Sequence, residues 1–224
     1  SSGHGSEDTI TDMIRCASES GLSLFGISDH GPATSSSAKP SYFQSLKLAD
    51  RDRFGIRVLY GAELNIINTA GDVDLDDEIL SALDYAIISI HPPIFKPYHD
   101  KDLSSAYIRA MDHPKVRFLG HIDDARFPVD FEYLLEIAKE KHVYPEINNG
   151  SLMPDAYRIN GQENCRRILS ICKKLDLPVL LSSDSHGKKN IGNMQYIFPL
   201  LEELDFPAHL VLNSDLSALS DIIR

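Results

Sequence analysis

The stretch YGAELNIINTAGDVDLDDEILSALDYAIISIH, residues 60–91, contains the pattern that decides the fold. Apolar residues concentrate near residues 58–66 and 85–90, and they predict two short, buried strands. Between them, residues 76–83 show the spacing of a helix with one apolar face. A strand, a helix and a second apolar strand in this order are typical of a parallel sheet that is covered by helices.

The same alternation extends in both directions from this stretch. Further strands are predicted at residues 22–28, 116–120, 143–148 and 179–183, and further helices at residues 102–111, 130–141 and 162–175. A helix also precedes the first of these strands, with Ser6 as its predicted N-cap and Gly21 at its end. Because no shift in composition divides the chain, we expect one α/β domain over residues 1–224.

Composition and charge narrow the possible partners. The chain has 224 residues, of which 42% are apolar and 25% charged, as in an ordinary globular protein. Its 33 acidic residues against 22 basic ones give a net charge of -11, which repels nucleic acids and anionic membranes. No apolar run approaches the roughly 18 residues of a membrane span, and no signal peptide is recognisable. Cys16, Cys165 and Cys172 form no CxxC pair, so we expect reduced thiols and a cytoplasmic protein.

Acidic residues and histidines stand at the ends of the predicted strands. In chain order they are Asp29 with His30, Glu63, His91, His121, Glu146 with Asn148, and Asp184 with His186. Parallel strands bring their carboxyl ends to one face, so these side chains are expected to be neighbours. Imidazoles and carboxylates bind divalent ions such as Zn²⁺, Mn²⁺ or Fe²⁺, and a cation would relieve the repulsion between Glu63 and Asp184. The sequence therefore predicts a metal centre.

Three irregular stretches follow predicted strands and are expected to surround this centre as loops. They cover residues 31–53, 92–101 and 149–161. His99 lies in the second of them, where a substrate contact and a plain surface position are both consistent with the sequence. His113, His142 and His209 do not follow strands, and we expect them to lie at the surface or at a helix end.

Six motifs in a fixed order carry a family resemblance that spans nearly the whole chain. They are SDHGP (28–32), GAELNI (61–66), SIHPPIF (89–95), LGH (119–121), EINN (146–149) and SSDSH (182–186). The set resembles the PHP superfamily, named for polymerase and histidinol phosphatase, and especially its small stand-alone bacterial phosphatases. The resemblance implies a distorted (β/α)7 TIM-like barrel, up to three divalent ions (Zn, Mn or Fe) and hydrolysis of a small phosphate monoester.

The resemblance also implies roles for individual residues. The ligands of one metal would be His4, His30 and His186, those of a second Glu63, His91 and His121, and Glu63 and Asp184 would bind a third. Asp184, His186 and Glu63 are thereby the catalytic candidates, with Asp184 orienting the attacking hydroxide. Arg158 aligns with an arginine of the relatives, and two roles are consistent with the sequence: a bidentate grip on the phosphate, or a plain surface position in a mobile loop. Arg126 and Lys188 are weaker candidates for the phosphate contact.

One element of the family pattern is missing from this sequence. The third metal normally takes two further ligands from an HxH motif on a first strand, upstream of the position that matches His4. This sequence has no HxH motif. We expect that strand to precede Ser1 in the natural protein, because Ser1 is not a start residue. The alternatives are a catalytically impaired PHP module with a structural or partner-binding role, and an amidohydrolase-type enzyme acting on C–N bonds. Against the latter, no lysine stands at a predicted strand end.

Overall fold

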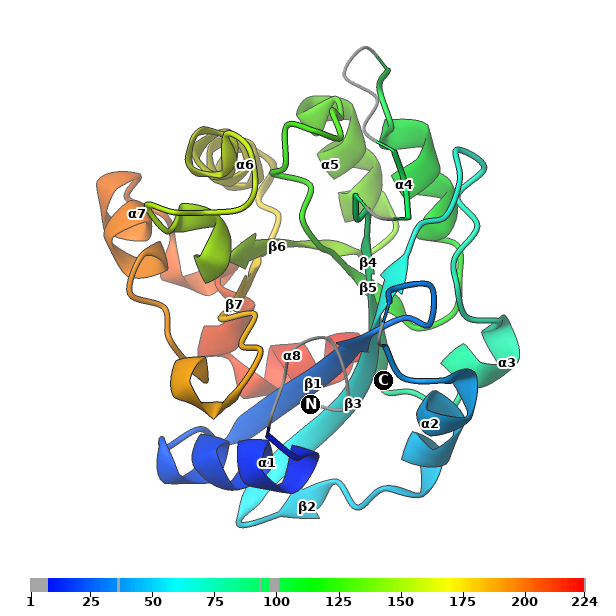
Figure 1. The fold of residues 1–224 in the computed structure, drawn as a ribbon. Coiled ribbons are helices and arrows are strands. Elements are labelled where there is room, and N and C mark those ends of the chain that lie inside the picture. Colours follow the sequence, from blue (N-terminus) through cyan, green and yellow to red (C-terminus); the bar gives the residue numbers. More distant parts are fainter. Residues whose placement is uncertain (1–7, 36, 93, 97–100, 224) are drawn as a thin grey trace.

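A curled, mostly parallel sheet forms the centre of the molecule in the computed structural model, which describes residues 8–35, 37–92, 94–96 and 101–223. Its parallel strands follow one another in chain order as β1 (Leu24–His30), β3 (Ile56–Asn65), β4 (Tyr85–Ser89), β5 (Val116–Leu119), β6 (Tyr144–Asn148) and β7 (Leu180–Ser182). The short β2 (Asp52–Arg53) pairs with β3 in the antiparallel direction. The sheet bends into a distorted TIM-like barrel with β1 and β7 as its edge strands (Figure 1), which confirms the predicted α/β class.

Helices surround this sheet on its outer side (Figure 1). They are α1 (Ile10–Glu19), α2 (Pro40–Ser45), α3 (Asp77–Leu80), α4 (Ser104–Ala110), α5 (Phe131–Glu140), α6 (Gly161–Leu175) and α7 (Ile197–Glu203), whereas α8 (Leu216–Ile223) lies across one end of the barrel. The described residues also form short 3-10 helices: η1 (Leu46–Leu48), η2 (Asn149–Leu152), η3 (Lys188–Asn190), η4 (Ala208–Leu210) and η5 (Leu212–Ser214). Every predicted strand and helix is present, with its ends shifted by a few residues.

Two local expectations were wrong. The N-cap of α1 is Thr9, whose hydroxyl accepts a hydrogen bond from the Asp12 backbone while the Asp12 side chain accepts one from the Thr9 backbone. Thr9 therefore holds the N-cap position predicted for Ser6, which lies outside the described residues. The predicted loop 31–53 contains α2, η1 and β2. Pro40 starts α2 because its fixed φ suits the first helical turn, and Phe43 anchors the helix by complete burial.

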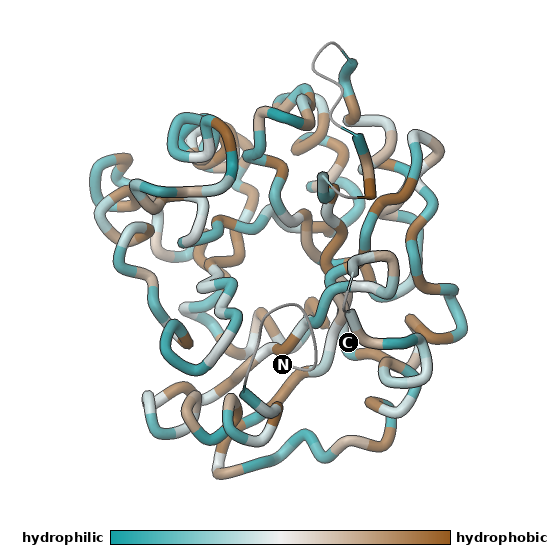
Figure 2. The backbone as a smooth tube through the Cα atoms, viewed as in Figure 1, coloured by the Kyte–Doolittle hydropathy of each residue, from teal (hydrophilic) through white to brown (hydrophobic). Residues whose placement is uncertain are grey.

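The core has an outer layer between sheet and helices and a smaller cluster inside the barrel. Hydrophobic segments, brown in Figure 2, follow the strands, whereas the helices alternate between brown and teal, as expected of elements with one buried face. The inner cluster joins the strand residues Leu59, Tyr85, Ile87 and Phe118 to Leu212, Leu219 and Ile223. α8 supplies the last two of these residues and so covers one end of the barrel.

Two of the three cysteines lie in the core. Cys165 and Cys172 are fully buried on the inner face of α6, and all three thiols are free. Burial raises the pKa of Cys172 to about 12.

Within the part of the chain that the structure describes, no helix has the length and apolar content that a membrane crossing requires.

Candidate metal centre

The carboxyl ends of four neighbouring strands bring three histidines to one glutamate. His30 ends β1 and is the direct register partner of Glu63 on β3. His91 and His121 follow the last residues of β4 and β5. His121 has a positive φ of 58°, an uncommon backbone conformation for a residue with a side chain. The predicted grouping of strand-end residues is therefore present in the geometry.

The Glu63 carboxylate lies at the centre of this group, in contact with all three histidines. Its Oε2 lies 3.2 Å from Nδ1 of His30, and its Oε1 lies 3.1 Å from Nε2 of His91 and 2.8 Å from Nε2 of His121. The His91 ring is 4.8 Å from the His30 ring and 5.4 Å from the His121 ring, centroid to centroid. Glu63 is only 7% exposed.

These residues fit a divalent cation. One ligand atom each from His30, Glu63 and His91 lie within 4.8 Å of one another. Nε2 of His91 and Oε1 of Glu63 are buried, and none of the contacts that they make among the described residues has the geometry of a hydrogen bond. Buried polar atoms are normally satisfied, and imidazole nitrogens with a carboxylate oxygen are a ligand set of Zn²⁺ and similar ions.

Charge complementarity inside the group is strong. Burial opposes the ionisation of Glu63, yet the neighbouring His121, His30 and His91 outweigh it and hold the pKa of Glu63 well below its usual range. Burial and the charge of Arg158 lower the pKa of His121, but Glu63 and Glu146 overcome both and raise it to about 9. The protein therefore surrounds a buried anion with groups that favour its charged form.

Asp184 and Arg158 close the group from the other side of the barrel. Oδ1 of Asp184 lies 3.3 Å from Nε2 of His186, and Oδ2 accepts a hydrogen bond from Nη2 of Arg158 at 3.1 Å. The same Nη2 lies 2.8 Å from Nε2 of His121. Burial opposes the ionisation of Asp184, but its partners His186, His121 and Arg158 keep the pKa of Asp184 well below its usual range. Arg158 thus links the β5 and β7 ends of the site.

A second layer of polar side chains holds the first in place. Glu146 is 5% exposed and accepts a hydrogen bond of 2.6 Å from the Ser182 hydroxyl, and its Oε2 lies 3.5 Å from Nδ1 of His121. Burial raises the pKa of Glu146. Asn148 donates to Oδ2 of Asp184 at 3.0 Å, and Asn149 accepts from the backbone of Tyr196 at 3.0 Å. Such contacts orient metal-binding side chains.

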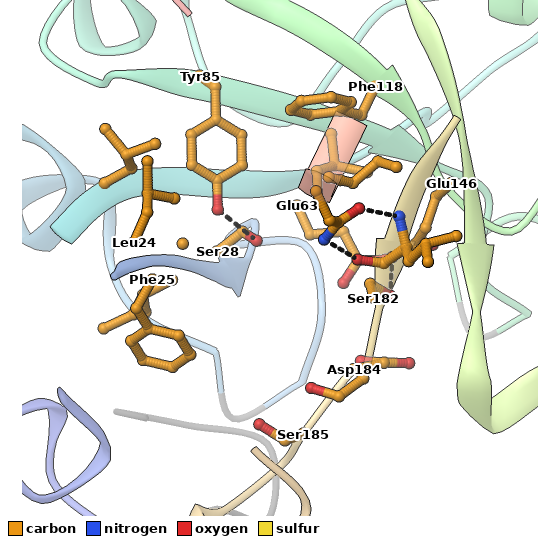
Figure 3. Close-up of a pocket in the computed structure, with 18 of the residues that line it drawn as sticks. Leu24, Phe25, Ser28, Glu63, Tyr85, Phe118, Glu146, Ser182, Asp184 and Ser185 are labelled. Carbon is orange, nitrogen blue, oxygen red and sulfur yellow. Dashed lines mark hydrogen bonds between the residues drawn. The ribbon is translucent and has the colours of Figure 1, made fainter. Parts of the chain in front are cut away.

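A cavity of about 260 Å³ lies below the site, inside the barrel and between β1 and β7. Figure 3 shows Glu63, Glu146 and Asp184 near one another, with Leu24 and Phe25 on the opposite side of the pocket. The phenol of Tyr85 crosses the space and shares a hydrogen bond of 3.2 Å with the Ser28 hydroxyl. The Tyr85 ring fits only because Gly61 faces it, since a Cβ there would lie 2.7 Å from the ring.

The structure brings six of the predicted metal-binding residues into this one site. They are His30, Glu63, His91, His121, Asp184 and His186, and Arg158 joins them. His4 and His99 lie outside the described residues. The weaker phosphate candidates are engaged elsewhere, Arg126 with Asp124 and Lys188 with Asp8.

Sequence reasoning missed one residue of the site, Asn65. Its Oδ1 lies 2.7 Å from Nδ1 of His91, and the residue is fully buried. Asn65 belongs to the GAELNI motif, two positions after Glu63, and therefore points to the same face of the strand as that glutamate. That spacing was the signal that could have identified it.

The comparisons with known proteins agree with this arrangement. The family model of the PHP domain matches residues 1–150. A probable phosphatase of Clostridium acetobutylicum is 36% identical over 214 residues, covering 96% of this chain and 86% of the relative. A probable phosphatase of Acetivibrio thermocellus is 32% identical over 223 residues, covering 100% of this chain and 91% of the relative.

Solved structures show the same fold at low identity. The histidinol phosphate phosphatase of Lactococcus lactis, crystallised with zinc, L-histidinol and phosphate, superposes with a TM-score of 0.62 at 19% identity. That match covers 92% of this chain and 91% of the other. A chain of an archaeal ribonuclease P bound to mature tRNA has the same TM-score and identity, over 96% of this chain and 87% of its own length.

Proposed function

Because the chain belongs to the PHP domain family, we propose that it is a metal-dependent phosphatase that hydrolyses a small phosphate monoester. One domain spanning residues 1–224 would carry the activity, since β6 and β7 continue the sheet beyond residue 150 and Asp184 follows β7. The names of the relatives, probable phosphatases, support the reaction class.

The convergence of His30, His91 and His121 on the buried Glu63 carboxylate is the observation that carries this proposal. A purely structural role would not require so many titratable groups at the mouth of one cavity. Together with Asp184 and His186 these side chains provide enough nitrogen and oxygen ligands for more than one divalent ion. His4 would complete the set.

The roles of the residues follow from their chemistry. Bound divalent ions would supply Lewis-acid activation of the phosphate and of the attacking water. Arg158 would grip phosphate oxygens with its planar guanidinium, which lies beside Asp184 and His121. Asp184 would orient the nucleophile through a carboxylate oxygen. The side chain of His186 is 47% exposed, which places it on the solvent side of the site, where substrate would enter. His99 would be a further substrate contact.

The test is hydrolysis of p-nitrophenyl phosphate by protein loaded with Zn²⁺, Mn²⁺ or Fe²⁺. We expect metal-dependent turnover in the unchanged protein and a fall in kcat of at least about 100-fold in Asp184→Ala and in His91→Ala. Metal activation lowers the activation barrier by several kcal/mol, and each 1.36 kcal/mol of barrier corresponds to a tenfold change in rate.

His142→Ala is the matched control, because His142 is an exposed histidine that follows α5, away from the strand-end cluster. Its turnover should equal that of the unchanged protein. Full activity in both site variants, or activity that survives complete chelation of metal, would contradict the proposal.

A further inference from the structure

We propose that Asn65 and Asp74 position His91 for metal binding by fixing which ring nitrogen carries its proton. The inference rests on the proposed function, since it concerns the same metal centre. It assigns a role to two residues that lie behind the cluster rather than in it.

The orientation of the Asn65 side chain is dictated by its neighbours. Its Nδ2 lies 2.6 Å from Oδ2 of Asp74 and 3.4 Å from the carbonyl oxygen of Gly31. Both are acceptors, so the amide nitrogen, which is the only donor of the side chain, must face them. The amide oxygen is left to face His91.

The oxygen of Asn65 then determines the tautomer of His91. Oδ1 can only accept a hydrogen bond, and it lies 2.7 Å from Nδ1 of the imidazole. Nδ1 must therefore carry a hydrogen in the neutral ring, which leaves the lone pair on Nε2, the atom 3.1 Å from Oε1 of Glu63. A histidine binds a metal through its unprotonated nitrogen, so Asn65 presents His91 in the binding form.

Asp74 makes this arrangement rigid. Its Oδ1 accepts from the backbone of Asn65 at 2.9 Å, and its Oδ2 accepts from the backbone of Ala33 at 2.9 Å as well as from the Asn65 side chain. Gly31 permits this close approach, because a Cβ there would lie 2.3 Å from the carboxylate. One carboxylate thus joins the segment after His30 to the end of β3.

Asp74→Asn is the first test, with Asp72→Asn as its control. The Asp74 oxygens both accept hydrogen bonds, so an amide at this position would place a donor against a donor. Asp72 also accepts from an asparagine side chain, that of Asn68, but at an exposed site away from the cluster. We expect Asp74→Asn to weaken zinc binding by about 10-fold, the lower end of the effect for such supporting residues, and Asp72→Asn to leave it unchanged.

Asn65→Leu is the second test, because leucine has a similar shape without donor or acceptor. We expect zinc affinity to fall by about 10- to 100-fold. Two-bond ¹H–¹⁵N correlation spectra should show His91 as the Nδ1–H tautomer in the unchanged protein and as a mixture in the variant. The exchanged pair N65D/D74N should recover the tautomer and part of the affinity, since the carboxylate introduced by N65D can accept from His91 and from the new amide, while the Ala33 backbone N–H loses its acceptor.

The outcomes separate this inference from the proposed function. If the unchanged protein binds zinc but hydrolyses no phosphate monoester, the proposed function is wrong while the inference stands; if it binds no zinc, the inference is wrong as well. Circular dichroism and thermal unfolding of each zinc-free variant establish that it is folded. A folded Asn65→Leu protein that keeps the Nδ1–H tautomer overturns the inference, as does an exchanged pair that binds zinc no better than Asn65→Leu.

Discussion

At the scale of single residues, Arg158 and a divalent ion require the same nitrogen atom. Nη2 of Arg158 lies 2.8 Å from Nε2 of His121, the atom that also approaches Glu63. A ring nitrogen has one lone pair and cannot bond to a guanidinium and a metal ion together. Metal binding at His121 therefore requires Arg158 to move, which frees its guanidinium for another anion such as a phosphate.

We expect Arg158→Gln to bind zinc roughly 10-fold more tightly than the unchanged protein. It removes the positive charge of a guanidinium whose Nη2 lies 2.8 Å from Nε2 of His121, and a cation so close opposes the binding of a metal ion at that nitrogen. The KM for a phosphate monoester should rise in the same variant. Zinc titration and steady-state kinetics measure the two effects, and Arg126→Gln, whose guanidinium pairs with Asp124 instead, should show neither. Weaker zinc binding in Arg158→Gln would contradict this account.

The same scale shows what the sequence could and could not predict about the site. Residues at strand ends, such as His30, Glu63 and His121, were identifiable because parallel topology alone brings them together. The Asn65 contact depends on Asp74, which returns to the site from a loop nine residues further along the chain. The path of that loop is not encoded in any local pattern.

At the scale of secondary-structure elements, helix α1 depends on its capping box. The Thr9 hydroxyl accepts a hydrogen bond of 3.1 Å from the Asp12 backbone. We expect Thr9→Ala to lower the free energy of unfolding by about 1 kcal/mol, the usual cost of losing an N-cap side chain. Urea unfolding followed by circular dichroism measures this loss. Ser20→Ala, at the exposed opposite end of α1, should change stability by less than about 0.5 kcal/mol. Equal effects of the two substitutions would rule out the capping role.

Elements were predictable where the sequence shows a clear apolar pattern. β4 is a short apolar run that is buried throughout, and α6 buries one face at helical spacing. The sequence did not predict α2, because this helix depends on tertiary packing against the rest of the chain. α2 is short, and it is held by the burial of Phe43 rather than by its own helical spacing. Helices of that length are not stable in isolation, so tertiary packing decides them.

At the scale of the whole molecule, α8 seals one end of the barrel. Leu219 is 5% exposed and packs in the inner cluster with Leu59, Tyr85 and Phe118, whereas Leu216 on the same helix is 45% exposed. We expect Leu219→Ala to cost about 2–5 kcal/mol of unfolding free energy through lost contacts and a new void. Leu216→Ala should cost less than about 0.5 kcal/mol. Urea unfolding compares them, and a Leu219→Ala loss no larger than that of Leu216→Ala would show that α8 does not support the core.

The position of α8 also sets an order for folding. Strands β3 to β7 each pair with the parallel strand that precedes them in the chain, so the sheet can grow by short-range steps as synthesis proceeds. The inner cluster is different, because Leu59 cannot be fully buried until Leu219 has been synthesised and packed in the same cluster. Until residues 212–223 have been made, the apolar interior of the barrel faces water. A ribosome-bound chain that ends before α8 therefore leaves this inner cluster exposed to aggregation and to capture by chaperones.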